Sequence, residues 1–217
     1  MVTMSVRVSP AGGAQRHETA DTRAALISGA IAALREAGFA GASSRQIAKR
    51  AGCNQALVFY HFGSLVDLLV AALEDVSARR MEAYRGLLDH TGTITELVDC
   101  ARSVFIEDLD AGHVTVLLEM IVGAQSVPGL SERVAACLAP WREIAERAVS
   151  RGLASAPAGS LLPAREMAHG VVAGILGLEL LANLDGDRAS ALALFDRARG
   201  AATMIDRIGR IKGRRNG

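Results

Sequence analysis

The chain has 217 residues, half of them apolar, and a formal net charge of +1. This length suits one large domain or a small domain joined to a larger one, and the apolar content excludes a disordered chain. No uninterrupted apolar run approaches the roughly 20 residues that cross a bilayer, and residues 1–25 lack the apolar centre of a signal peptide. We therefore expect a soluble cytoplasmic protein without a membrane partner.

The chain lacks the residue patterns of an enzyme or a metalloprotein. Cys53, Cys100 and Cys137 lie far apart without CxxC spacing, and the five histidines are scattered without HExxH or HxH pairs. There is no GxSxG sequence, no phosphate-binding glycine loop and no pair of catalytic groups. We predict no catalytic residue, no metal site and no cofactor.

Charge is unevenly distributed along the chain. Residues 1–65 carry a net charge of +4, and residues 66–217 carry a net charge of −3. A basic N-terminal part favours binding of a polyanion at that end, although many solvated helices have the same composition.

The first helix is predicted from Asp21 to about Ala37. Residues 1–20 contain Pro10 and two glycines without periodicity, which predicts a mobile arm. Gly38 suits the left-handed position that ends a helix. An apolar stripe with three- and four-residue spacing marks the buried face of this helix: Leu26, Ile27, Ala30, Ile31 and Leu34.

Two short helices follow in a tight arrangement. Ser43 and Gln46 have the spacing of a capping box, and the helix that they start ends at Gly52. Asn54 is a good N-cap for the next helix, only two residues later. Two residues at i, i+4 spacing would anchor that helix inward: Val58 and Phe62. Two helices joined so tightly cross steeply, which predicts a helix-turn-helix.

The rest of the chain is also predicted to be helical. The expected helices cover about 64–90, 93–110, 113–125, 131–151, 163–184 and 187–211, with a kink at Pro140 and a linker at 155–160. No stretch predicts a strand. The sequence predicts an all-α fold of about nine helices, with a helix-turn-helix domain at 21–66 and a larger helical domain at 67–217.

The stretch GFAGASSRQIAKRAGCNQALVFYHFGSLVDLL, residues 38–69, resembles the DNA-binding signature of TetR-family transcriptional regulators. The matching dipeptides are Gly38-Phe39, Ile47-Ala48, Ala51-Gly52 and His61-Phe62. The resemblance implies a one-component bacterial repressor whose larger helical domain binds an effector and dimerises. It also implies a pseudo-palindromic DNA operator, because two recognition helices read two half-sites.

The resemblance further implies a set of DNA-contacting residues: Ser44, Arg45, Asn54, Gln55, Phe59, Tyr60 and His61. Arg45 and Gln55 would read bases, since Arg donates two hydrogen bonds to guanine and Gln pairs with adenine. A solvated Arg45 and a capping or packing His61 are the alternatives. The chain departs from the family pattern at Phe59, where tyrosine is usual, and at Leu65, where lysine is common. Both departures remove a phosphate contact.

The helix predicted from residue 163 carries a stripe of small residues, Gly170, Ala173, Gly174 and Gly177. Interior helix glycines usually permit the close approach of another helix. The family resemblance implies that the last two helices form a four-helix bundle with a second subunit, over about 163–211. The expected buried residues are Leu176, Leu180, Leu181, Leu192 and Phe195, and a contact within one chain is the alternative.

A few polar or aromatic residues lie among apolar ones in the middle helices. The predicted effector-binding residues are Phe105, His113, Met120, Trp141 and His169, with Glu119 and Gln125 as further candidates. An apolar pocket with a few polar groups would suit a hydrophobic small molecule, although each residue also suits the core or the surface.

The sequence thus predicts a dimeric repressor that an effector releases from DNA. The alternatives are an enzyme with a helical core and a helical adaptor that has lost operator binding. Cys53 in the predicted turn is interpreted as a buried hydrophobe, and the competing hypothesis is a thiol whose oxidation releases DNA.

Overall fold

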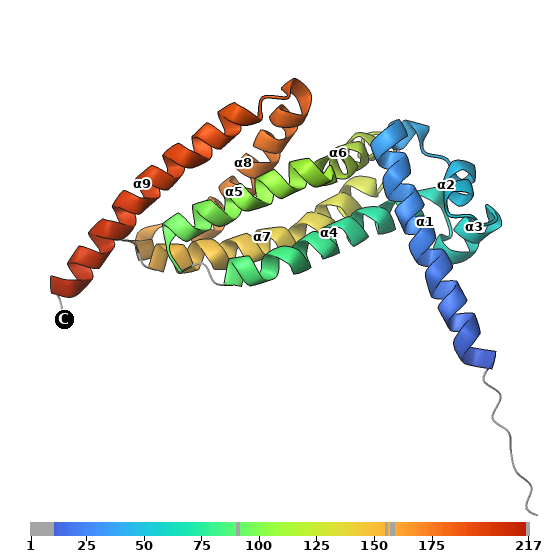
Figure 1. Ribbon diagram of the computed structural model, residues 1–217, viewed down its shortest axis with the longest axis horizontal. Coiled ribbons are helices and arrows are strands. Elements are labelled where there is room, and N and C mark those ends of the chain that lie inside the picture. The colour runs from blue at the N-terminus through green and yellow to red at the C-terminus, as the bar shows by residue number, and fades with distance from the viewer. Residues whose placement is uncertain (1–10, 90–91, 155, 157–158, 216–217) are drawn as a thin grey trace, which may run out of the picture. The chain divides into compact units, whose positions relative to one another are not determined.

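The computed structural model describes residues 11–89, 92–154, 156 and 159–215, and every long segment of this part is helical (Figure 1). These residues form nine α-helices and one short 3-10 turn, without a strand, which confirms the predicted all-α fold. The helices are α1 (Ala11–Gly41), α2 (Ser44–Arg50), α3 (Ala56–Phe62), α4 (Leu65–Asp89), α5 (Ile94–Ala111), α6 (His113–Ala124), α7 (Leu130–Ala154), α8 (Ala164–Asp185) and α9 (Arg188–Arg215). The 3-10 turn is Gly159–Leu161.

The chain divides into two compact units. Unit 1 ends at Ala72 and unit 2 begins at Leu73, so α4 starts in unit 1 and finishes in unit 2. The division predicted after residue 66 falls in the first turn of the same helix.

Helix α1 begins at Ala11, which corrects the prediction of a mobile arm over residues 11–20. Residues 1–10 lie outside the described part, so their mobility stays a prediction. The prediction gave too much weight to two glycines, each of which costs about 1 kcal/mol in a helix, and too little to the helix-forming residues that follow. Gly38 has φ 70° and ψ −179°, which confirms the break predicted there.

The core of unit 1 holds α1, α2 and α3 together. Leu26, Leu34, Ile47 and Val58 are fully buried. A Cβ atom on Gly29 would lie 3.1 Å from the Ile47 carbonyl oxygen, so glycine permits the close approach of α1 and α2. This packing fixes where α2 and α3 present their outer faces.

In unit 2, α8 packs on α7, and α9 packs along α5 (Figure 1). The Phe105 and Phe195 rings, 5.4 Å apart, join α5 to α9 in the core. A buried carboxylate on α9 strengthens this contact, because Asp206 Oδ2 accepts hydrogen bonds from the Thr95 backbone N at 3.0 Å and from Thr95 Oγ1 at 2.6 Å. The capping box predicted for α5 is present, with Thr93 and Glu96 as its partners.

Two helices are long and apolar enough to cross a membrane by composition, residues 19–41 and α8, contrary to the expectation that none would be. The expectation counted uninterrupted apolar runs, whereas alanine and interspersed aliphatic residues keep the mean hydropathy of these helices high. Residues 19–41 bury their stripe inside unit 1, while α8 leaves most of its apolar surface uncovered.

Candidate nucleic-acid interface and effector site

Helix α2 presents two cations on one face. Its N-cap is Ser43, whose Oγ accepts a hydrogen bond from the Gln46 backbone N at 3.3 Å, as predicted. Arg45 and Lys49 are one turn apart and exposed. The opposite face of α2 carries the buried residues, so its cations face outward.

The turn between α2 and α3 depends on glycine for its conformation. Gly52 has φ 66°, in the left-handed region, although a Cβ atom there would meet no described atom within 4 Å. Asn54 Oδ1 then accepts a hydrogen bond from the Ala56 backbone N at 2.9 Å. The N-cap position of α3 is Gln55, which makes no side-chain cap hydrogen bond, so the N-cap predicted at Asn54 lies one residue too early. Cys53, between Gly52 and Asn54, is half-buried with a free thiol.

Helix α3 is anchored by one side chain and exposes the next two. Val58 is fully buried, whereas Phe59 is 49% exposed and Tyr60 is 78% exposed. The Tyr60 ring meets the half-buried His61 ring edge-on at 5.0 Å. Aromatic groups left on a surface next to cations are typical of a binding face rather than of a packing defect.

A side-chain hydrogen bond joins the starts of α2 and α3. Gln55 Nε2 donates to Ser44 Oγ at 2.8 Å, and Arg45 is the next residue on α2. This bond brings three of the predicted DNA-contacting residues together. It was not predicted, because the two residues are eleven positions apart.

Arg50 contributes to the positive net charge of residues 1–65, but its guanidinium forms an ion pair with Glu36. Arg50 Nη1 donates to Glu36 Oε1 at 2.8 Å, and this hydrogen bond lowers the pKa of Glu36. Arg45 and Lys49 are therefore the cations of α2 that remain for a polyanion.

The predicted effector-binding residues do not converge on one cavity. Phe105 and Met120 are fully buried in the core, which corrects their assignment, since apolar side chains in an apolar stripe pack against neighbouring helices. His113 Nδ1 lies 3.3 Å from Asp108 Oδ1, and His169 is exposed. Trp141 Nε1 donates to Ser77 Oγ at 2.7 Å. Glu119 is half-buried and Gln125 is exposed.

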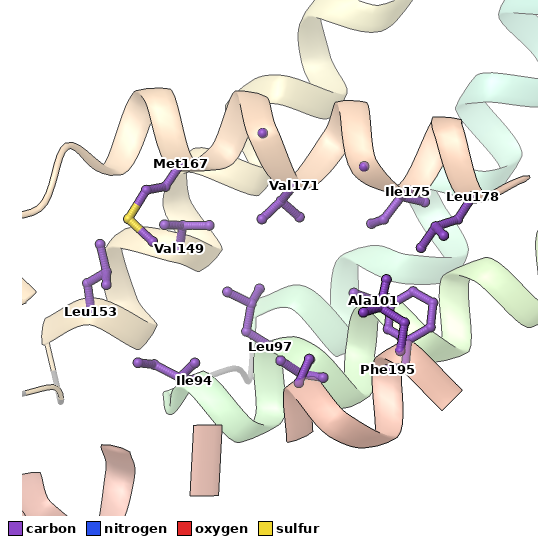
Figure 2. Close-up of a pocket in the computed structure, with 15 residues that line it drawn as sticks. Ile94, Leu97, Ala101, Val149, Leu153, Met167, Val171, Ile175, Leu178 and Phe195 are labelled. Atoms are coloured by element: carbon purple, nitrogen blue, oxygen red, sulfur yellow. The ribbon is translucent and has the colours of Figure 1, made fainter. Parts of the chain in front are cut away.

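A cavity of about 310 Å³ in unit 2 is apolar and lies between α5, α7, α8 and α9. Figure 2 shows Val171, Ile175 and Leu178 of α8 pointing toward Leu97 of α5 and Phe195 of α9. No charged side chain and none of the five predicted residues is among the described residues that line it. We name it the apolar cavity.

The glycines of α8 lie beside empty space and do not touch another described helix of the same chain. A Cβ atom on Gly170, Gly174 or Gly177 would meet no described atom within 4 Å. Gly170 and Gly174 line the apolar cavity. These three glycines therefore make no close helix contact among the described residues, although α8 itself packs on α7.

The residues predicted for the dimer interface divide into two groups. Phe195 belongs to the core of its own chain, which corrects its assignment. Leu180 and Leu181 are 37% and 57% exposed, and Leu176 and Leu192 are half-buried. The exposed members lie on α8.

A smaller cavity of about 60 Å³ lies among buried charges, and we name it the charged cavity. Arg80 of α4 and Glu179 of α8 line it together with Trp141. The Arg80 guanidinium lies 4.8 Å from the centre of the Trp141 ring and forms an ion pair with Asp108 of α5. Burial lowers the pKa of Arg80 and raises that of Glu179 to about 7.

Arg80 and Glu179 were not singled out in the sequence analysis. A signal was present for Glu179, because it is the one charged residue in the stretch GILGLELLANL, residues 174–184. A lone carboxylate in an apolar helix is costly unless it is paired or functional.

The comparisons with known proteins agree with this architecture. Residues 26–72 match the family described as bacterial regulatory proteins, tetR family. The HTH-type transcriptional regulator CymR of Pseudomonas putida is 27% identical over 164 residues, 71% of this chain and 79% of CymR.

Two solved structures show the same fold. A TetR-family member from Streptomyces coelicolor A3 has a TM-score of 0.62 and 27% identity, over 85% of this chain and 97% of its own. The transcriptional regulator FadR from Bacillus subtilis, in complex with stearoyl-CoA, has a TM-score of 0.68 and 17% identity, over 82% of this chain and 95% of its own. Residues 26–72 thus carry the TetR-family DNA-binding domain, and together with the α2–α3 geometry these matches identify the protein as a DNA-binding transcriptional regulator.

Proposed function

We propose that the protein is a dimeric repressor that binds a pseudo-palindromic operator through α2 and α3 and is released by a small-molecule effector held in unit 2. The observation that carries the proposal is the hydrogen bond from Gln55 to Ser44, which holds the exposed Gln55 beside the first turn of α2, where Arg45 is exposed too. The alternative of a helical adaptor has no support among the relatives, which are described as transcriptional regulators.

The exposed face suits base reading and phosphate binding at once. Arg45 supplies the fork of donors that matches guanine, and the hydrogen bond that Gln55 Nε2 donates to Ser44 Oγ orients Gln55 before DNA arrives. Lys49 and the Tyr60 hydroxyl are free to meet phosphates at the edge of the same face, since both are exposed. Asn54, Phe59 and His61 complete the proposed contact set.

The operator proposal is tested by selecting binding sites from a random duplex DNA pool at low and moderate salt. We expect an inverted repeat, whose half-sites report the two recognition helices of a dimer. The Arg45→Ala variant should no longer enrich this sequence. The Arg85→Ala variant, which lacks an exposed cation of unit 2, should still enrich it. Failure to enrich any sequence at either salt would overturn the proposal.

The proposed dimer forms through α8 and α9. Apolar side chains on these helices are strongly exposed in the single chain, namely Leu181, Leu184, Met204 and Ile208. A soluble protein rarely leaves such a surface uncovered, and the open glycines of α8 allow a second helix to approach closely.

Sedimentation without detergent at micromolar concentration tests this interface. We expect a dimer for the wild type and a monomer for Leu184→Glu, with Ala83→Glu on the exposed side of α4 as the control for added charge. A monomeric wild type would contradict the proposal, and recovery only with lipid or detergent would assign the apolar face of α8 to a membrane instead.

The proposed effector occupies the apolar cavity. Its volume of about 310 Å³ is that of a small ligand pocket, and its uncharged lining favours an apolar molecule. The FadR structure from Bacillus subtilis holds stearoyl-CoA, so a protein of this fold accommodates a ligand with a long apolar chain. An effector releases DNA only if it binds one conformation of the dimer more tightly, and α4 is the helix whose residues belong to both units.

A further inference from the structure

Glu179 is a buried carboxylate whose hydrogen-bonding capacity is unmet. It is 0% exposed, and neither of its oxygens has a hydrogen-bond partner among the described residues. Buried carboxylates are nearly always hydrogen-bonded or ion-paired, because leaving them bare costs several kcal/mol. Both oxygens belong to a side chain that lines the charged cavity.

The charges around Glu179 leave a deficit of positive charge. Arg80 attracts Glu179 electrostatically, but its guanidinium is ion-paired with Asp108 and stacked on Trp141. The Tyr84 hydroxyl also donates to Asp108 Oδ1, at 3.4 Å. The single positive charge of Arg80 is therefore shared between two buried carboxylates, those of Asp108 and Glu179. It does not fully neutralise Glu179 when Glu179 is ionised.

His113 of α6 is the other group that faces this cluster. Its Nδ1 lies 3.3 Å from Asp108 Oδ1, so it is directed at Asp108, and it acts on Glu179 only through its charge when protonated. The charged groups that face Glu179 from the neighbouring helices thus come from α4, α5 and α6, and none donates a hydrogen bond to it among the described residues.

The charged cavity adjoins the apolar cavity at one residue. Ile175 of α8 lines both. The charged cavity, at about 60 Å³, has the volume of roughly two water molecules and holds a head group but not a whole ligand. The apolar cavity has room for the remainder.

We propose that the effector is an amphipathic amine whose protonated nitrogen pairs with Glu179 in the charged cavity while its apolar body fills the apolar cavity beyond Ile175. This inference rests on the proposed effector function and specifies its ligand. An ammonium group supplies both the hydrogen-bond donors and the positive charge that the site lacks. An alcohol supplies a donor only, and a carboxylate adds a third negative charge.

The pairing predicts a pH dependence with a definite sign. Burial raises the pKa of Glu179 to about 7, so the ionised form that attracts an ammonium becomes dominant above that pH. An alkylamine, with a pKa of about 10, stays protonated throughout this range. Amine affinity should therefore rise between pH 6 and pH 8. The contribution of Glu179 to this rise is the difference between the wild type and Glu179→Gln.

The test measures binding of octylamine, octanol and octanoate to the full-length protein by calorimetry at pH 6 and pH 8, below micelle-forming concentrations. For the wild type at pH 8 we expect octylamine to bind at least ten times more tightly than octanol, and octanoate to bind most weakly. Glu179→Gln should reduce octylamine binding to the level of octanol and leave octanol unchanged. Glu166→Gln, an exposed position on the same helix, is the matched control.

The outcomes separate this inference from the proposed function. Equal binding of octylamine and octanol, insensitive to Glu179→Gln, would overturn the amine proposal and leave the apolar cavity as the effector site. Binding of none of the three probes would overturn both. Should Glu179→Gln fail to fold, the comparison of probes on the wild type at pH 8 decides: octylamine that binds at least ten times more tightly than octanol supports the amine proposal, and octylamine that binds no more tightly than octanol overturns it.

Discussion

The two units differ in where their candidate functional polar side chains lie: at the surface in unit 1 and in the interior in unit 2. In unit 1, Arg45, Gln55 and Tyr60 are exposed on short helices whose inner faces are fully apolar. In unit 2, Asp108 and Glu179 are completely buried. A large, charged partner such as DNA must be met at the surface, whereas a small ligand can be enclosed. The difference has an energetic consequence, because exposed charges are solvated and buried charges depend on one another.

The largest expected difference between the units is in the free energy of unfolding that is lost when one arginine is removed from each. Arg80→Ala leaves Asp108 buried without its cation, so we expect a loss of about 3–5 kcal/mol in the free energy of unfolding. Arg50→Ala breaks the exposed pair with Glu36 and should change stability little. Urea unfolding at pH 7 measures both, and Arg79→Ala controls for loss of a surface arginine from α4. Equal effects of Arg80→Ala and Arg50→Ala would contradict the buried network.

Glu179→Gln should raise stability at high pH. The folded pKa of Glu179, about 7, lies above the unfolded value of 4.5, so the folded state holds an extra proton between these values. The contribution of Glu179 to the free energy of unfolding is most favourable below pH 4.5. It then falls by about 1.4 kcal/mol per pH unit until about pH 7. The variant should remove that slope and be more stable at pH 8 by on the order of 3 kcal/mol. Denaturation midpoints from pH 4.5 to 8 test this, and an unchanged slope would show that Glu179 is not the titrating group.

We expect Arg45→Ala to weaken operator binding without changing the stability of the fold. This variant therefore tests the exposed face of unit 1 separately from its core. We expect a loss of about 1–3 kcal/mol in operator affinity, roughly 5- to 150-fold, if Arg45 reads a guanine. The melting temperature should stay the same because Arg45 is exposed. Electrophoretic mobility shifts with the selected operator and with random DNA measure the effect, and an equal loss on both would reassign Arg45 to phosphate contact.

The smallest expected effect concerns the two exposed aromatic residues of α3. Phe59→Tyr restores a hydroxyl where the family usually has one, and should strengthen operator binding by about 0.5–1.5 kcal/mol. Tyr60→Phe is its counterpart and should weaken binding by a similar amount. The same mobility-shift titration measures both, and no change for either variant would place the phosphate contacts elsewhere.

The helix-turn-helix was predictable because its determinants are local. Ser43 caps α2 by accepting from Gln46, Asn54 closes a turn with Ala56 at the start of α3, and Gly52 supplies the left-handed turn. Such signals act within one or two helical turns and are visible in the order of residues. The link between Ser44 and Gln55 was the part of this unit that depended on the crossing of two helices.

The proposed effector site was not predictable in the same way. The candidates were polar or aromatic residues in apolar helices, and Phe105 and Met120 proved to be core residues. The small residues of α8 indicated a close helix contact, whereas in the single chain they line open space. Whether an apolar residue packs or lines a cavity depends on the distances between helices, which the pattern of one helix does not contain.

By itself, the sequence determined the all-α class, the order of the helices and the position of the DNA-binding helices, because periodicity, caps and turn glycines act over a few residues. Only the tertiary structure decided which charges meet. Arg80, Asp108 and Glu179 lie on three helices and are separated by tens of residues, and their pairing follows from how those helices pack. Helix packing also encloses the apolar cavity beside them, since its lining comes from four helices that no local signal brings together.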